Sequence, residues 1–217
     1  LQNLAQAFLL KVNTIATQPT NQESLPELQA QFSSNLGGAI QAAKRATEIN
    51  PKDSQNWLVL GKVYEDVSVL VPGAAEKAIE SYGGALKLEP NNPLVVTALA
   101  RAQMFAGDFN DRQDDRVSRI KYYEEALATA EKAVVLKGDY LPAHFLIAQV
   151  YDRQGKDRLA IAKSDEIASI NDPLIFYQLG LFHWQSSRWE TAKNYFQQAI
   201  NLFPNYSNAR YYLGLIY

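Results

Sequence analysis

The sequence predicts an all-α protein, a solenoid of about eleven helices arranged as successive helix-turn-helix pairs without a β-sheet. Three observations lead to this prediction. Small, aromatic and leucine positions return along the chain at the spacing of a helix pair of ~34 residues. Prolines close several of these units, where they end a helix. The composition, with 47% hydrophobic and 20% charged residues, is that of a chain that packs a core.

The repeat is clearest near the C-terminus. A glycine on the first helix and an alanine on the second let the two helices approach closely, while a leucine and an aromatic residue fill the space beside them. A proline then ends the unit. The residues at these positions are Phe176, Leu179, Gly180, Ala192, Phe196, Ala199 and Pro204, followed in the next unit by Arg210, Leu213, Gly214 and Tyr217.

The same residue types recur upstream. A unit with a short insertion between its helices contains Trp57, Leu60, Gly61, Tyr64, Ala78, Tyr82, Ala85 and Pro90. Two weaker units without the proline contain Val96, Leu99, Ala100, Gly107, Ala126, Ala130 and Ala133, and then His144, Ile147, Ala148, Tyr151, Gly155 and Ala160. Ahead of them, Ala39, Ala43 and Ala46 before Pro51 predict the second helix of a degenerate pair, whose first helix falls within residues 1–17.

After a gap over residues 18–24, a hydroxyl, a proline and an acid at Ser24, Pro26 and Glu27 form a helix-start signal.

Together these positions resemble the tetratricopeptide repeat (TPR) family, whose helix pairs stack into a right-handed superhelix. On that resemblance we divide the chain into six parts. They are a degenerate helix pair at 1–53, a repeat with a short insertion at 54–92, a repeat with a long insertion at 93–140, two repeats at 141–172 and 173–206, and the first helix of a truncated repeat at 207–217. Apolar residues after Gly107 keep helical steps, so we expect the long insertion to extend the second helix of its pair.

The sequence favours a protein that is not an enzyme and predicts no catalytic residue, metal site or cofactor. Lys and Arg total 21 against 23 for Asp and Glu, which argues against nucleic acid as a partner. There are no cysteines and two histidines, and His144 and His183 fall at positions that we expect to be packed in the core.

Two weaker motifs have structural interpretations. The acidic stretch around Asp108, Asp114 and Asp115 has Arg112 at the third ligand position of a calcium loop and Arg119 where the bidentate acid belongs, so we interpret it as helix capping on a solvated face. The pairs Gly37–Gly38 and Gly83–Gly84 lie within helical patterns, and close helix packing explains them better than phosphate binding.

The TPR resemblance implies where a partner binds. In this family the first helices of successive pairs line a concave groove that takes an extended peptide or a partner helix, so we predict a protein or peptide as the partner. Position by position, the lining residues are Lys62, Arg101, Gln149, Tyr177, Gln178, Leu181, Trp184 and Tyr211. Two cations at one end and aromatic residues at the other suit a peptide with an acidic and an apolar part. Of these residues, we expect Trp184 to contribute most to binding. The alternative is that Tyr177, Trp184 and Tyr211 pack against a following repeat.

Some TPR proteins hold the C-terminal carboxylate of chaperones, but Leu58 and Lys62 depart from that pattern.

A second resemblance concerns a larger protein. Over most of its length the chain is similar to the repeat tails of bacterial membrane proteins related to O-antigen ligases and polymerases, through Ala46, Asn50, Pro51, Asn56, Trp57, Gly61, Tyr64, Gly73, Ala74, Tyr82, Pro90, Asn91 and Pro93. The resemblance implies a regulatory tail of a glycan-polymerising protein. The chain begins at Leu1, has no apolar run long enough to cross a bilayer, and ends in an apolar helical pattern at Tyr217. We therefore expect a soluble segment of a longer protein, attached on this resemblance to a bacterial membrane protein, with self-assembly through the C-terminal end as an alternative function.

Overall fold

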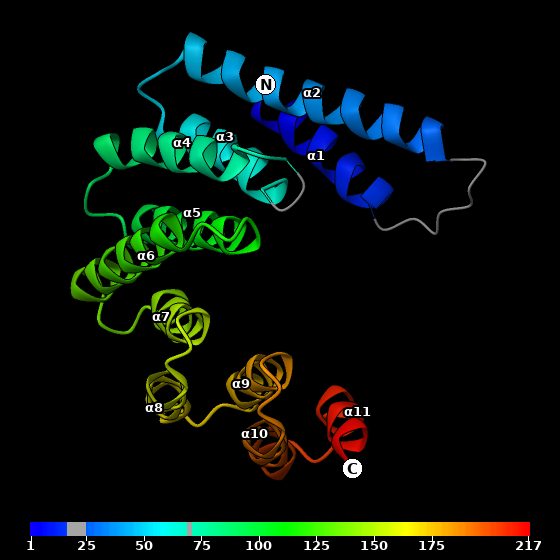
Figure 1. Ribbon diagram of the computed structural model, residues 1–217, viewed down its shortest axis with the longest axis vertical. Helices are drawn as coiled ribbons and strands as arrows, with labels where there is room; N and C mark the ends of the chain where they lie inside the picture. The colour runs from blue at the N-terminus through cyan, green and yellow to red at the C-terminus, as the bar shows by residue number, and fades with distance from the viewer. Residues whose placement is uncertain (17–24, 69–70) are drawn as a thin grey trace. The chain divides into compact units, whose positions relative to one another are not determined.

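The computed structural model describes residues 1–16, 25–68 and 71–217, and in these ranges the chain forms eleven helices and no strand (Figure 1). The all-α prediction is therefore confirmed. The chain divides into two compact units, Leu1–Gly138 and Asp139–Tyr217. Unit 1 contains α1 (Gln2–Ala16), α2 (Leu25–Ile49), α3 (Ser54–Asp66), α4 (Ala74–Leu88), α5 (Pro93–Arg112) and α6 (Arg116–Leu136). Unit 2 contains α7 (Leu141–Arg153), α8 (Asp157–Ala168), α9 (Pro173–Gln185), α10 (Trp189–Leu202) and α11 (Ser207–Ile216).

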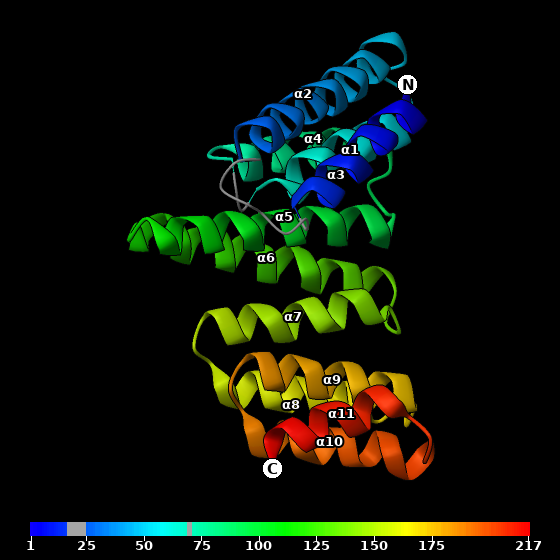
Figure 2. The same ribbon diagram turned by 90° about the vertical axis from the view of Figure 1, so that its right-hand side faces the viewer.

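Within each unit, helices that follow one another in the chain pack together (Figure 2). In unit 1 these are α1 on α2, α3 on α4, and α5 on α6, and the first helices α1, α3 and α5 are also neighbours. Several helices begin where a side-chain oxygen accepts a hydrogen bond from a backbone N–H of the first turn. Asp53, Asn92 and Asp172 do so for α3, α5 and α9, and the last two precede a proline at the first helical position.

Three glycines allow close packing of the paired helices: Gly61 and Gly180 at the same repeat position, and Gly107 seven residues after the equivalent Ala100. A Cβ atom added to Gly61, Gly107 or Gly180 would lie 2.5 Å from an aromatic carbon of the paired helix. These aromatic residues are Tyr82, Tyr123 and Phe196. Close helix packing explains only one glycine of each glycine pair. Gly38 lies under the Phe8 ring and Gly84 under the Trp57 ring. Gly37 and Gly83 face open space.

The insertion after Gly107 differs from the prediction. It lengthens both helices of the pair and not the second alone. Helix α5 has 20 residues against 13 in each of the first helices α3, α7 and α9, and α6 has 21 against 15, 12 and 14 in the second helices α4, α8 and α10. Helix α5 continues past Gly107 because that glycine is packed against Tyr123 of α6, whose hydroxyl donates to Asp108 Oδ1 at 2.8 Å. The turn that follows has Asp114 in the left-handed region, with φ 58°.

Two smaller expectations are confirmed. Asp115 caps α6 by accepting from the Ser118 backbone N–H, so this part of the acidic stretch is a helix cap. His144 and His183 are both buried. The expected helix start is seen at Leu25, but Ser24 and the rest of the predicted gap lie outside the described residues. None of the described helices is long and apolar enough to span a bilayer.

Candidate functional site

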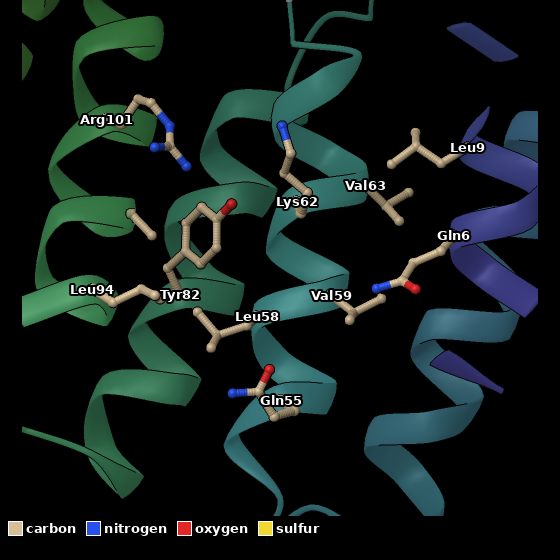
Figure 3. Close-up of a pocket in the computed structure, with 11 residues that line it drawn as sticks. Gln6, Leu9, Gln55, Leu58, Val59, Lys62, Val63, Tyr82, Leu94 and Arg101 are labelled. Atoms are coloured by element: carbon tan, nitrogen blue, oxygen red, sulfur yellow. The ribbon is translucent and has the colours of Figure 1, made fainter. Parts of the chain in front are cut away.

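A cavity of about 230 Å³ opens between the first helices of unit 1 (Figure 3). Helix periodicity explains which side chains face it, because residues three and four apart share one face of a helix. Its lining residues are Gln6 and Leu9 of α1; Gln55, Leu58, Val59, Lys62 and Val63 of α3; Leu94, Ala98 and Arg101 of α5; and Tyr82 of α4. Two of the eight predicted partner-binding residues, Lys62 and Arg101, therefore lie together in this cavity.

The wall of the cavity is mainly apolar, and its polar groups are separated. Leu58 and Val59 are half-buried, and the Leu94 side chain is 51% exposed at the start of α5. In Figure 3, Lys62 and Arg101 lie at one end, with the Tyr82 hydroxyl between them, and Gln55 lies at the other. Tyr82 itself is almost fully buried, because its ring packs on Gly61. The cavity is thus an apolar groove with cations at one end and a carboxamide at the other.

The two cations share a buried carboxylate, that of Glu65. Its side chain is 4% exposed and accepts hydrogen bonds from Arg101 Nε at 3.0 Å, Tyr82 OH at 3.0 Å and Lys62 Nζ at 3.3 Å. Lys62 also forms an ion pair with Asp66. Two positive and two negative charges are therefore compensated within this cluster, which we call the Glu65 cluster: Lys62, Glu65, Asp66, Tyr82 and Arg101.

The electrostatics of the Glu65 cluster keep Tyr82 protonated and keep Lys62 and Arg101 charged. Burial and the Glu65 charge raise the pKa of the Tyr82 phenol, so it remains a hydrogen-bond donor. Burial lowers the pKa of the Arg101 guanidinium, but the contact with Glu65 outweighs it and the net pKa is raised. Likewise, contacts with Asp66 and Glu65 outweigh burial and raise the pKa of Lys62. Because these cations already have partners, the cluster gives less support to an acidic ligand than the sequence suggested.

The remaining predicted residues lie in unit 2, and the structure brings the aromatic ones together. The ring of Tyr212 on α11 lies 6.2 Å from Tyr177, 5.2 Å from Trp184 and 5.4 Å from Tyr211. Trp184 also meets Trp189 edge-on at 5.9 Å. Tyr177 and Trp184 thus pack against α11 within the described chain, whereas the Tyr211 side chain is 64% exposed.

The other three predicted residues of unit 2 have different surroundings. Leu181 is partly buried against the core of the unit, Gln178 is exposed, and Gln149 is half-buried on α7.

Sequence reasoning missed most of the apolar groove and the whole role of Glu65. Leu58, Val59, Leu94 and Ala98 could have been found, because they lie three, four or seven residues from Lys62 or Arg101 and so share their helix faces. Glu65 lies three residues from Lys62 and could have been found in this way too, but its contact with α5 could not. Its partner Arg101 is 36 positions away in the sequence.

Comparisons with known proteins agree with this architecture. The family model described as "Tetratricopeptide repeat" matches residues 177–217, which contain most of α9 and all of α10 and α11. The BBSome complex member BBS4 of Bos taurus is 27% identical over 173 residues, which is 78% of this chain and 30% of that protein. The chain therefore spans about a third of the length of this relative.

Solved structures show the same fold. The thermophilic TPR protein TTC0263 of Thermus thermophilus superimposes with a TM-score of 0.63 at 20% identity, over 87% of this chain and 94% of that one. PilW, a type IV pilus biogenesis factor, superimposes with a TM-score of 0.53 at 19% identity, over 89% of this chain and 91% of PilW. MamA superimposes with a TM-score of 0.52 at 23% identity, over 80% of this chain and 91% of MamA. The protein thus has the all-α fold of a TPR solenoid.

Proposed function

We propose that the protein is a non-catalytic scaffold that binds an extended segment of another protein in the groove between α1, α3 and α5. The observation that carries this proposal is the apolar cavity lined by three neighbouring first helices. Stacked helix repeats commonly use such concave surfaces for binding. A relative that is a member of a complex also suits a scaffold role.

The chemistry of the groove indicates the kind of segment that it accepts. Its volume of about 230 Å³ is smaller than the ~300–1,000 Å³ of most small-molecule sites, which favours the insertion of individual side chains. Leu58, Val59 and Leu94 provide apolar contacts for such side chains, while Gln55 and Gln6 offer amide donors and acceptors for the backbone of the segment. We therefore propose an apolar segment with little net charge.

The non-catalytic part of the proposal rests on the groups that face the groove. Among the described residues that line it there is no histidine, serine or carboxylate, so a general base next to a nucleophile is not formed there. Its two cations are paired with Glu65 and Asp66. The groove can hold and orient a segment, and it offers no group that would cleave or modify one.

A charge placed in the groove should weaken binding. A phage-displayed library of random linear peptides is selected against the protein, and the dissociation constants of recovered peptides are measured by fluorescence polarisation. We expect Leu94→Asp to weaken binding at least tenfold, about 1.4 kcal/mol or more, because the carboxylate loses water when an apolar side chain docks beside it.

Val117→Asp is the matched control. Val117 is the second residue of α6, as Leu94 is of α5, and it is 81% exposed and outside the groove. Val117→Asp should change the affinity by less than twofold. Equal affinities for the two variants would place the binding site elsewhere.

Two alternatives from the sequence remain proposals. Self-assembly through the C-terminal end is favoured by the exposed side chains of Tyr211, Leu215 and Tyr217 on and after α11. Attachment to a glycan-polymerising bacterial membrane protein rests on the resemblance of sequence alone.

A further inference from the structure

In unit 2, the ring of His183 is fully buried and both of its nitrogens are hydrogen-bonded. Nδ1 accepts from Arg188 Nε at 2.8 Å, because a guanidinium nitrogen can only donate. Nε2 lies 3.0 Å from Ser164 Oγ, and the Ser164 hydroxyl donates to the Ala160 carbonyl at 2.9 Å. Since that hydroxyl hydrogen is already used, Nε2 carries the hydrogen in the Nε2···Oγ bond. His183 is therefore neutral, with its only N–H on Nε2.

The Arg188 side chain joins His183 to two other helices. It lies at the N-cap of α10 and is 14% exposed. One of its terminal nitrogens bonds to Asp152 Oδ1 at the end of α7 and to Asp157 Oδ1 at the start of α8, the latter at 2.9 Å. Ser186 also donates to Asp152, at 3.0 Å. The guanidinium thus holds the beginning of α10 against α7 and α8, and His183 fixes its orientation through Nε.

Charged and titratable groups face His183 from every helix packed against it. Asp152 approaches from α7 and Asp165 from α8, and both favour the protonated ring. The charge of Arg188, at the N-cap of α10, disfavours the protonated ring. Tyr195 of α10 stacks on the His183 ring, with ring centroids 5.4 Å apart. The Tyr195 hydroxyl donates to Asp165 at 2.6 Å, so this carboxylate is already engaged.

A proton on Nδ1 is incompatible with this arrangement. It would change Nδ1 from an acceptor into a donor that faces the Arg188 Nε–H, and it would place two positive charges next to each other in a buried site. Accordingly, burial and the Arg188 charge lower the pKa of His183 to about 4, against the opposing effects of Asp152 and Asp165.

We propose that His183 and Arg188 form an acid-sensitive lock in unit 2. When His183 takes up a proton on Nδ1, the Arg188 guanidinium is displaced from Asp152 and Asp157, and α10 loosens from α7 and α8. At neutral pH the lock is closed. The lock lies in unit 2 and does not depend on the proposed groove of unit 1. An experiment that contradicts one of the two proposals therefore does not contradict the other.

The sign of the pH dependence follows from the direction of the shift. The unfolded chain binds the proton near the ordinary histidine pKa of about 6.5, whereas the folded chain binds it near 4. Stability from this group is therefore complete above about pH 6.5 and is lost as the pH falls toward 4. Over this window the contribution of His183 alone should raise the unfolding equilibrium constant by about a few hundredfold, at about tenfold for each pH unit.

The direct test is an NMR titration of the whole 217-residue chain, in which only two histidines contribute ring signals. His183→Gln identifies the His183 signals by their loss. In the unmodified protein we expect the Nε2–H tautomer of His183 at pH 7 and a protonation midpoint near 4. The Arg188 Nε–H chemical shift, which reports the hydrogen bond to Nδ1, should move toward that of an exposed arginine with the same midpoint.

A titration of His183 near pH 6.5, or an Arg188 Nε–H chemical shift that stays unchanged when His183 is protonated, would overturn the proposal. Arg188→Gln provides an independent readout, because it removes the neighbouring charge and should raise the His183 midpoint above that of the unmodified protein. An unchanged midpoint in that variant would also contradict the lock.

Discussion

Gly61→Val is expected to lower the free energy of unfolding by about 2 to 3 kcal/mol, the usual effect of overpacking a core. A Cβ atom at this position would lie 2.5 Å from the Tyr82 ring, which is buried and bonded to Glu65 through its hydroxyl. The ring cannot move away without breaking that hydrogen bond. Urea denaturation followed by circular dichroism measures the change, and amide exchange in α3 and α4 locates it.

Gly83→Ala is the control for helix propensity. Gly83 lies in the middle of α4, and a Cβ atom added there meets nothing within 4 Å. Because alanine favours a helix over glycine by ~1 kcal/mol, this variant should be slightly more stable than the original chain. If Gly61→Val were equally harmless, the close packing of α3 on α4 through Tyr82 would be wrong.

Glu65→Ala is expected to lower the free energy of unfolding by about 3 kcal/mol or more, because it leaves buried groups without their partner. Tyr82 OH and Arg101 Nε both bond to the same Glu65 oxygen, and removal of the carboxylate leaves the phenol buried and the guanidinium unbalanced. Unfolding in urea again gives the free energy. The double variant Glu65→Ala, Arg101→Ala should lose less free energy of unfolding than the two single variants lose together, since the two residues act as one unit.

Glu80 on α4 provides the matched comparison. Its side chain is 68% exposed and pairs with Lys77 at the surface, so Glu80→Ala should leave the stability nearly unchanged. Equal effects of Glu65→Ala and Glu80→Ala would show that the Glu65 cluster does not stabilise unit 1.

The sequence was sufficient for features that arise within one helix or one helix pair. The glycines and aromatic residues at repeated offsets predicted the paired helices, and the contacts of Gly61, Gly107 and Gly180 agree with them. The length of α5 was missed because a glycine usually marks a weak point in a helix, whereas Gly107 is held inside α5 by the Tyr123 ring.

Features that join different repeats were harder to predict. Lys62 and Arg101 follow from repeat positions, and they do line the cavity. The pair of Lys62 with Glu65 lies within α3, but the pair of Arg101 with Glu65 depends on how α5 packs beside α3, which the pattern of residue types does not determine. The contact of His183 with Arg188 lies within one repeat, but it depends on the turn between α9 and α10, which the pattern does not determine either. Both histidines were expected in the core. That His183 carries its proton on Nε2 follows only from the hydrogen-bond partners of its two ring nitrogens.

The most direct test of the groove is to find where a selected peptide contacts the protein. Intermolecular nuclear Overhauser effects are measured between an unlabelled peptide and methyl-labelled protein. Peptide protons should lie close to the methyl groups of Leu58, Val59 and Leu94, which line the α1–α3–α5 cavity. Contacts with Leu213, Leu215 and Ile216 of α11 instead, and none with those three residues, would contradict the proposed groove.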